Sequence, residues 1–465
     1  MTTTRILPGA LLALGLAAAA GPAAAQERQA PPAPGTPKAF RVPPARRFAL
    51  PNGLRVTLVP YGTTPKATVL LTVRTGNGDE GPQETWLTDL TADLMQEGTT
   101  TRSAAQIADQ AAAMGGSLSV SVGEDRTWAG GDVLGEFAPG MVELVADVVR
   151  NPRFPEPELP RLQAAIARQV AIARSQPQSL AGERFRQVLY PGHAYGRSFP
   201  SEAQLLGYTA AQVRAYHAAH FGAGRSHLYV AGRFDAAAVE EAVRRAFGTW
   251  GRGPAAADIR PEPASGRAVY LIDRPGAVQS TLFLGLPTVG PTHPDWVPLQ
   301  VTDALLGGAF ASRITANIRE AKGYTYSPYS MVSQRLGSAF WLQQADVTTP
   351  VTGASLTEIF REIQRLQDEP PPAEELRGIQ NYLAGTFVLR NSSRRGIINQ
   401  LSFLDLHGLP EDYLETFVQK VYAVTPAEVQ RIARTYLVEE RMPIVVVGDR
   451  AAVEEQLRPF GEIRP

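Results

Sequence analysis

The folded part of this chain contains an internal sequence repeat. Thr209-Ala-Ala-Gln-Val213 recurs as Thr425-Pro-Ala-Glu-Val429, and His227-Leu-Tyr-Val-Ala-Gly232 recurs as Pro443-Ile-Val-Val-Val-Gly448, both 216 positions later. Ala238-Val-Glu-Glu241 then recurs as Ala452-Val-Glu-Glu455 after a two-residue deletion. A constant spacing across several segments indicates a duplicated unit rather than chance similarity. The sequence therefore predicts two tandem homologous domains of about 200 residues each.

Composition suggests where these domains begin and end. We expect the N-terminal domain at 46–250 and the C-terminal domain at 267–465. The segment 251–266 is dense in Gly, Pro and Ala, which is typical of an exposed linker. Residues 26–45 are rich in Pro and Ala and predict a disordered leader.

Hydrophobic periodicity predicts the fold class of each domain. Valine and leucine alternate with polar residues at 55–60 and 67–75, and the same alternation returns at 268–272 and 279–286. In the first half, helical patterns cover 84–97, 104–114, 137–149 and 159–174, and further strands are expected at 117–123 and 127–133. Because strands and helices come in groups, we predict α+β domains, each an antiparallel sheet with helices on one face.

The first 25 residues have the pattern of a cleavable signal peptide. Arg5 provides the positive charge, 11–20 is a short apolar core, and Ala23-Ala24-Ala25 forms a small-residue cleavage site. No later run approaches the roughly 20 apolar residues of a membrane helix. We therefore expect an exported protein without a membrane anchor, in the periplasm of a Gram-negative bacterium or, alternatively, secreted.

The composition excludes several classes of function. The chain has no cysteine, which rules out thiolate metal sites and cysteine nucleophiles. Lys plus Arg equals Asp plus Glu, at 45 each. Since nucleic-acid binding depends on an excess of positive charge, nucleic acid is not an expected partner.

A set of motifs, in order along nearly the whole mature chain, resembles the pitrilysin/insulinase family of zinc peptidases and the related mitochondrial processing peptidase subunits. These motifs are Leu50-Pro-Asn-Gly-Leu-Arg-Val56, Gln96-Glu-Gly-Thr99, Leu189-Tyr-Pro-Gly-His-Ala-Tyr-Gly196, Leu306-Gly-Gly308, Ser312-Arg313 and Ile318-Arg-Glu-Ala-Lys-Gly-Tyr-Thr-Tyr-Ser327. Active members carry His-x-x-Glu-His on a helix of the first domain, where two histidines bind zinc and the glutamate is the general base.

The resemblance implies that the zinc site of this chain is degenerate. The two histidine positions fall on Asp89 and Asp93, the position of the base falls on Ala92, and that of the distal glutamate ligand falls on Gln169. No histidine lies between the signal and His193. We therefore expect no metal cofactor in this chain.

Two alternatives for a metal remain open from the sequence. Asp89, Asp93 and Glu97 lie on one helix face, where they form either a solvated acidic surface or a site for a hard cation with oxygen ligands. His217, His220 and His227 have a spacing that can bind zinc, but no carboxylate lies near them in sequence to act as a base.

The resemblance also implies that the peptide-facing residues are retained. In the family, an arginine and a tyrosine seven residues apart reach toward the scissile carbonyl, and by motif these are Arg319 and Tyr326, with Tyr324 expected to line the same surface. A guanidinium and a phenol both donate hydrogen bonds, so they stabilise an oxygen that gains negative charge.

The combined pattern predicts a non-catalytic subunit, inactive alone, that acts with a zinc-bearing homologous partner. In such a heterodimer, Arg319 and Tyr326 would act in trans on a peptide substrate, and zinc would lie in the partner. The alternative is a peptide-binding or scaffold protein with no role in peptide cleavage.

Overall fold

A computed structural model describes residues 40–257 and 260–465. The predicted signal peptide lies outside the described residues, as does the leader up to residue 39. No helix within the described ranges is long and apolar enough to cross a membrane.

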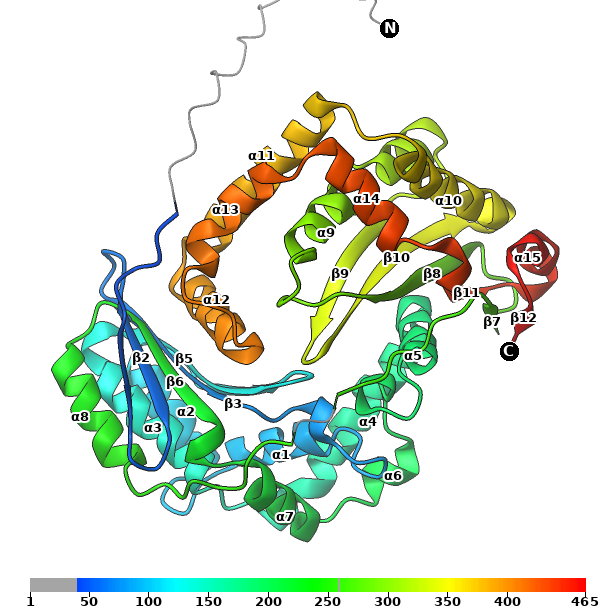
Figure 1. Ribbon diagram of the computed structural model, residues 1–465. Coiled ribbons are helices and arrows are strands. Elements are labelled where there is room, and N and C mark those ends of the chain that lie inside the picture. Colours follow the sequence, from blue (N-terminus) through cyan, green and yellow to red (C-terminus); the bar gives the residue numbers. More distant parts are fainter. Residues whose placement is uncertain (1–39, 258–259) are drawn as a thin grey trace, which may run out of the picture. The chain divides into compact units, whose positions relative to one another are not determined.

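The first half contains a six-stranded sheet in the order β1-β2-β6-β3-β5-β4 (Figure 1). Its strands are β1 (Arg46–Ala49), β2 (Arg55–Pro60), β3 (Lys66–Val73), β4 (Ser119–Val122), β5 (Thr127–Leu134) and β6 (Ser226–Gly232). Its helices are α1 (Leu87–Gln96), α2 (Ala104–Ala113), α3 (Ala138–Arg150), α4 (Leu159–Ser175), α5 (Pro177–Leu189), α6 (Glu202–Leu206), α7 (Ala210–His220) and α8 (Ala236–Phe247).

The second half contains a six-stranded sheet in the order β12-β7-β11-β8-β10-β9, in which five strands repeat the first sheet and the edge strand differs. Edge strand β12 comes last in the chain and pairs parallel with β7, whereas β1 comes first and pairs antiparallel with β2. Its strands are β7 (Val269–Asp273), β8 (Gln279–Thr288), β9 (Tyr329–Arg335), β10 (Ser338–Thr348), β11 (Ile444–Gly448) and β12 (Ile463–Arg464). Its helices are α9 (Trp296–Asp303), α10 (Thr352–Asp368), α11 (Ala373–Arg390), α12 (Arg394–His407), α13 (Tyr413–Ala423), α14 (Pro426–Tyr436) and α15 (Arg450–Leu457). Two wider π-helical segments are η6 (Ala304–Gly308) and η7 (Thr315–Ala321).

The predicted α+β class with two tandem homologous halves is confirmed. The sheets are mixed rather than wholly antiparallel, because β2 pairs parallel with β6, and β7 pairs parallel with β11 and β12. A hairpin forces antiparallel pairing, but β6 and β11 are each reached through a long series of helices, and such a connection permits the parallel arrangement.

The repeat extends to individual hydrogen bonds. Thr209 and Thr425 both begin a helix with a capping box, in which the threonine hydroxyl accepts from the backbone of the third helical residue and that residue's side chain accepts from the threonine N–H. The side-chain amide of Gln163 in α4 donates to backbone carbonyls just before α7, and that of Gln380 in α11 donates to backbone carbonyls just before α14. The recurring sequence motifs therefore correspond to recurring structure.

Each sheet is covered on both faces. The helices of the same half pack on one face, as predicted, and form the main core of that half. The opposite face of the first sheet contacts Ile397, Ile398 and Leu401 of α12, a helix of the second half. The opposite face of the second sheet contacts Ala181 and Phe185 of α5, a helix of the first half. The two halves thus exchange one helix each.

Candidate functional site

Helix α1 is where an active relative would hold zinc. Its start is fixed by Glu80, whose carboxylate accepts the backbone N–H groups of Trp86 and Thr88, both at 2.9 Å. Burial raises the pKa of Glu80 to about 8 despite these hydrogen bonds. Trp86 has a left-handed backbone with φ of 62°, so the helix begins at Leu87, three residues later than the sequence predicts.

The acidic residues of α1 are not a freely solvated surface. Asp89 and Asp93 are both half-buried. Asp89 accepts a 2.6 Å hydrogen bond from the Asn77 amide. Burial and the charge of Asp93 raise the pKa of Asp89 to about 6. The pKa of Asp93 is raised by burial and by Glu97, which itself pairs with Arg161. The solvated-surface interpretation therefore describes this helix poorly.

The surroundings of Asp89 do not fit zinc. Ala92 is 2% exposed within the hydrophobic core and offers no proton acceptor. Gln169 lies on the exposed side of α4. A pocket of about 200 Å³ beside Asp89 contains Arg186 and Arg197, two cations that oppose a divalent ion. Within the described residues, no three His, Asp or Glu side chains are placed to hold a metal ion.

The three histidines with zinc-like spacing have separate structural partners. His217 Nε2 lies 2.8 Å from the Val149 carbonyl. His220 stacks on the ring of Tyr216 at 4.2 Å. His227 contacts Thr57 and Asp405. These three histidines therefore do not form the ligand set of a zinc hydrolase.

The structure brings Arg319 and Tyr326 together. The guanidinium carbon of Arg319 lies 5.0 Å from the centre of the Tyr326 ring, which indicates a cation–π contact. Tyr326 is 80% exposed, and no hydrogen bond from the described residues holds its hydroxyl. Both residues line a pocket of about 350 Å³. A cation and a phenol are therefore presented side by side at the surface.

Local backbone geometry explains this placement. Arg319 lies on η7, and π-helical turns occur often at functional sites because they redirect a side chain. Gly323, with φ of +65°, donates its N–H to the Arg319 carbonyl and ends the helical segment. Tyr324 then turns toward the core of the second half, where it is half-buried, and does not line the pocket of Arg319 and Tyr326.

Phe310 is a member of this site that sequence reasoning missed. Its ring lies 4.5 Å from the Arg319 guanidinium carbon, so Arg319 contacts two aromatic rings, Phe310 and Tyr326. Phe310 is 71% exposed, which is unusual for a large apolar residue. The only sequence signal was its position directly after the Gly307-Gly308-Ala309 run.

Comparison with known proteins finds matches along most of the chain. Residues 55–200 match the family described as Insulinase (Peptidase family M16), and residues 207–383 match the Peptidase M16 inactive domain. An uncharacterised zinc protease of Mycobacterium tuberculosis is 28% identical over 91% of this chain and 98% of its own length. One from Bacillus subtilis is 23% identical over 85% of this chain and 96% of its own length.

Solved structures share the fold. A peptidase M16 inactive domain from Pseudomonas fluorescens has a TM-score of 0.80 at 23% identity and covers 87% of this chain and 98% of that one. A protease from Helicobacter pylori has a TM-score of 0.81 at 18% identity and covers 88% of this chain and 100% of that one. With the two family matches in tandem and in order, this chain belongs to the insulinase family of peptidases, M16, as a peptidase-like protein with an inactive-type domain.

Proposed function

We propose that this protein is the non-catalytic subunit of a heterodimeric zinc peptidase. A homologous partner would supply the zinc and the general base, and this chain would supply Arg319 and Tyr326 together with part of the wall around the peptide. The observation that carries the proposal is the contrast between two sites. The residues around Asp89 do not suit zinc, whereas Arg319 and Tyr326 are paired and exposed.

The chemistry of the pair suits the step that a zinc peptidase must accelerate. When water attacks a peptide carbonyl, the carbonyl oxygen gains negative charge. The Arg319 guanidinium and the Tyr326 hydroxyl would donate hydrogen bonds to that oxygen and stabilise it. The contact with Tyr326 limits the motion of Arg319, and such preorganisation of a donor lowers the cost of reaching the transition state.

Export to the periplasm through a cleaved signal peptide is part of the proposal. It requires that the zinc-bearing partner be exported as well. Western blotting of host cell fractions would test this directly, with the mature protein expected in the periplasmic fraction and about 25 residues shorter than the full chain.

A reconstituted complex would test the role of Arg319. The protein would be purified with a zinc-bearing family member from the same host, and cleavage of an unstructured peptide would be followed by mass spectrometry. Loss of one donor to a developing oxyanion costs roughly 100- to 1,000-fold in kcat, so we expect a loss of that order for Arg319→Ala. Tyr326→Phe, which removes only the hydroxyl, should also lower kcat.

Arg377→Ala is the matched control. Arg377 makes a similar exposed cation–π contact, 5.3 Å from the ring of Tyr422, but lies on α11 and does not line the pocket of Arg319 and Tyr326. Its replacement should leave kcat unchanged. Equal activity of the Arg319→Ala and wild-type complexes would rule out donation in trans. A purified chain that binds peptide but no homologue would instead favour the scaffold alternative.

A further inference from the structure

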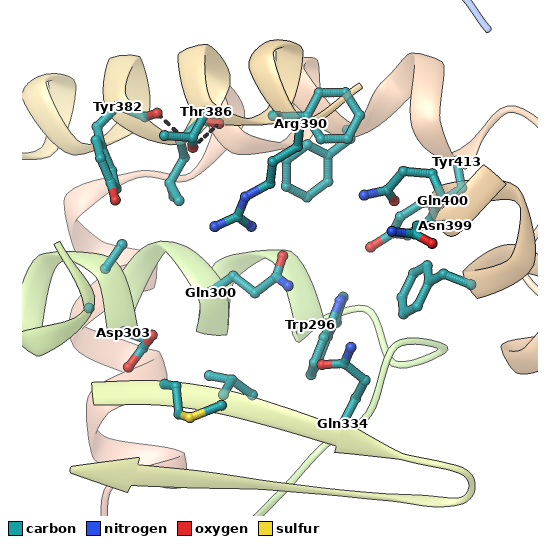
Figure 2. A pocket seen from close by; sticks show the side chains of 18 of the residues that line it. Trp296, Gln300, Asp303, Gln334, Tyr382, Thr386, Arg390, Asn399, Gln400 and Tyr413 are labelled. Atoms are coloured by element: carbon teal, nitrogen blue, oxygen red, sulfur yellow. Dashed lines mark hydrogen bonds between the residues drawn. The ribbon is translucent and has the colours of Figure 1, made fainter. Parts of the chain in front are cut away.

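The second half contains a cavity of about 690 Å³ that the proposed peptidase role does not use (Figure 2). Its walls come from α9, α11, α12, α13 and β9, and Arg126 contributes from the connection between β4 and β5. Its volume falls within the range of ligand-binding pockets, which is roughly 300 to 1,000 Å³.

Polar side chains converge on this cavity without partners in the protein. In Figure 2, Arg390 extends from α11 toward Gln300 of α9, and Asn399 and Gln400 enter from α12. Among the residues that the structure describes, the side-chain amides of Gln300, Asn399 and Gln400 form no hydrogen bond; Asn399 is exposed, Gln400 is half-buried, and among these amides only Gln300 Oε1 is a buried atom without a partner. Buried polar groups are nearly always hydrogen-bonded to protein, water or a ligand.

Trp296 is the most buried of these groups. Its side chain is 1% exposed, and its Nε1 lies beside the Tyr413 hydroxyl but without the geometry of a hydrogen bond. An indole N–H is only a donor. The cavity thus holds a buried donor as well as amide groups that can both donate and accept.

The charge of the cavity is positive. Exposed Arg390 and half-buried Arg126 line it, and neither forms an ion pair with any described residue. Arg126 donates to the Ser402 carbonyl at 2.6 Å, and the carboxylates of Asp125 and Asp405 act on its charge without forming an ion pair with it. The only carboxylate in the lining is Asp303, whose Oδ1 already accepts from Ser330 at 2.6 Å and from Trp341 at 2.8 Å.

We propose that this cavity binds a peptide carboxylate, from an acidic side chain or from a free carboxyl terminus, with Arg390 as its ionic partner. The guanidinium presents paired N–H donors that match a carboxylate. The amides of Gln300, Asn399 and Gln400 suit the peptide groups next to it, and the aromatic walls suit side chains. The choice of a peptide rests on the proposed function, whereas the choice of an anion rests on the charges alone.

Calorimetric titration of the purified full-length protein tests this proposal. The probes are four acetylated hexapeptides, Ala-Gln-Phe-X-Ala-Gly, with X as Glu or Gln and with a free or an amidated carboxyl terminus. A charge-assisted hydrogen bond lost from the complex should weaken binding roughly tenfold or more. The peptide with Gln and an amidated end should therefore bind at least tenfold more weakly than the peptide with both carboxylates. The two singly charged peptides show which carboxylate is recognised.

Arg390→Gln should abolish this discrimination while leaving binding of the neutral peptide unchanged. Arg395→Gln is the control, because Arg395 is an exposed arginine nearby in sequence that does not line the cavity. The proposal would be overturned if the wild type bound all four peptides with equal affinity or bound none of them. It would also be overturned if the Arg390→Gln variant still discriminated between the peptides. The assay needs neither a partner subunit nor peptide cleavage. The proposed peptidase role can therefore be disproved while carboxylate binding is confirmed, and carboxylate binding can be disproved while the peptidase role is confirmed.

Discussion

At the residue scale, Asp89 lies at a position where the family resemblance predicts a lost zinc ligand. A carboxylate in a half-buried position needs a positive partner, and zinc would supply one in an active relative. Here Asp89 forms a hydrogen bond with the Asn77 amide but no ion pair with Arg186 or Arg197 of the same pocket, and Asp93 lies one turn away. The raised pKa of Asp89, about 6, reflects this uncompensated burial. The folded protein therefore binds a proton at Asp89 more tightly than the unfolded chain does.

Asp89→Asn should stabilise the protein at alkaline pH. Because the folded-state pKa lies above the unfolded value, the stability of the wild type falls as pH rises from about 4 to about 6 and stays lower above that. Asparagine removes the charge and can still accept from Asn77. We expect the free energy of unfolding to rise by about 1–3 kcal/mol at pH 8 and to change little at pH 4. Urea denaturation at both pH values measures this, with the exposed Asp109→Asn as control. A loss of stability at pH 8 would contradict the assignment.

The candidate site could be predicted from sequence only where a motif fixes it. The family resemblance implied that Arg319 and Tyr326 share one surface, and the Arg319 guanidinium does lie against the Tyr326 ring. Phe310 could not be found in this way, because its contact with Arg319 depends on how η6 and η7 are placed. The cavity of Arg390 could not be predicted either, since its walls come from elements that are far apart in the sequence.

At the element scale, helices α5 and α12 link the folding of the two halves. Phe185 of α5 is 1% exposed and packs edge-on against Phe340 of β10, with ring centres 5.7 Å apart. It also lies 6.4 Å from the ring of Phe283 on β8. A helix encoded in the first half therefore buries one face of the sheet of the second half.

Phe185→Ala should destabilise the second half more than the first. Removal of a buried phenylalanine ring leaves a cavity and typically costs about 3–5 kcal/mol. We expect hydrogen exchange, followed by mass spectrometry, to accelerate in peptides from 279–288 and 338–348 before it does in peptides from 66–73. Ile172→Ala provides the control, because Ile172 is 65% exposed on α4. Faster exchange confined to the first half would show that α5 does not stabilise the second sheet.

The repeat made much of this architecture predictable, but not the helix exchange. Periodicity identifies an element from its own residues, so helices such as α3 and α4 were predicted to within a few positions. The pattern predicted no helix at α5, and nothing in its own residues says which sheet it covers. That sheet lies more than 90 residues away in sequence, and no local pattern encodes such a contact.

At the scale of the whole molecule, a polar cluster joins α12 of the second half to the sheet of the first half. Asp405 accepts from Tyr229 and contacts His227, both on β6, and pairs with Arg55 of β2 at 3.0 Å. Burial would raise the pKa of Asp405, but the hydrogen bond and charge of His227, with Tyr229 and Arg55, outweigh it and lower the pKa to about 2. The folded state therefore favours the ionised carboxylate.

Asp405→Asn should weaken the attachment of α12 to the first sheet. A folded-state pKa below the unfolded value gives stability that is present above about pH 4 and is lost as pH falls toward 2. We expect the variant to lose about 1–2 kcal/mol of unfolding free energy at pH 7, and less than half of that near pH 2.5, because the wild type has then lost most of the same contribution. Glu411→Gln breaks only an exposed ion pair with Arg47 and should cost less than about 0.5 kcal/mol. Equal losses of unfolding free energy for both variants in denaturation curves at pH 7 would mean that the cluster around Asp405 contributes no more than an ordinary surface contact. In that case, the hydrophobic contacts of Ile397, Ile398 and Leu401 alone would hold α12 against the first sheet.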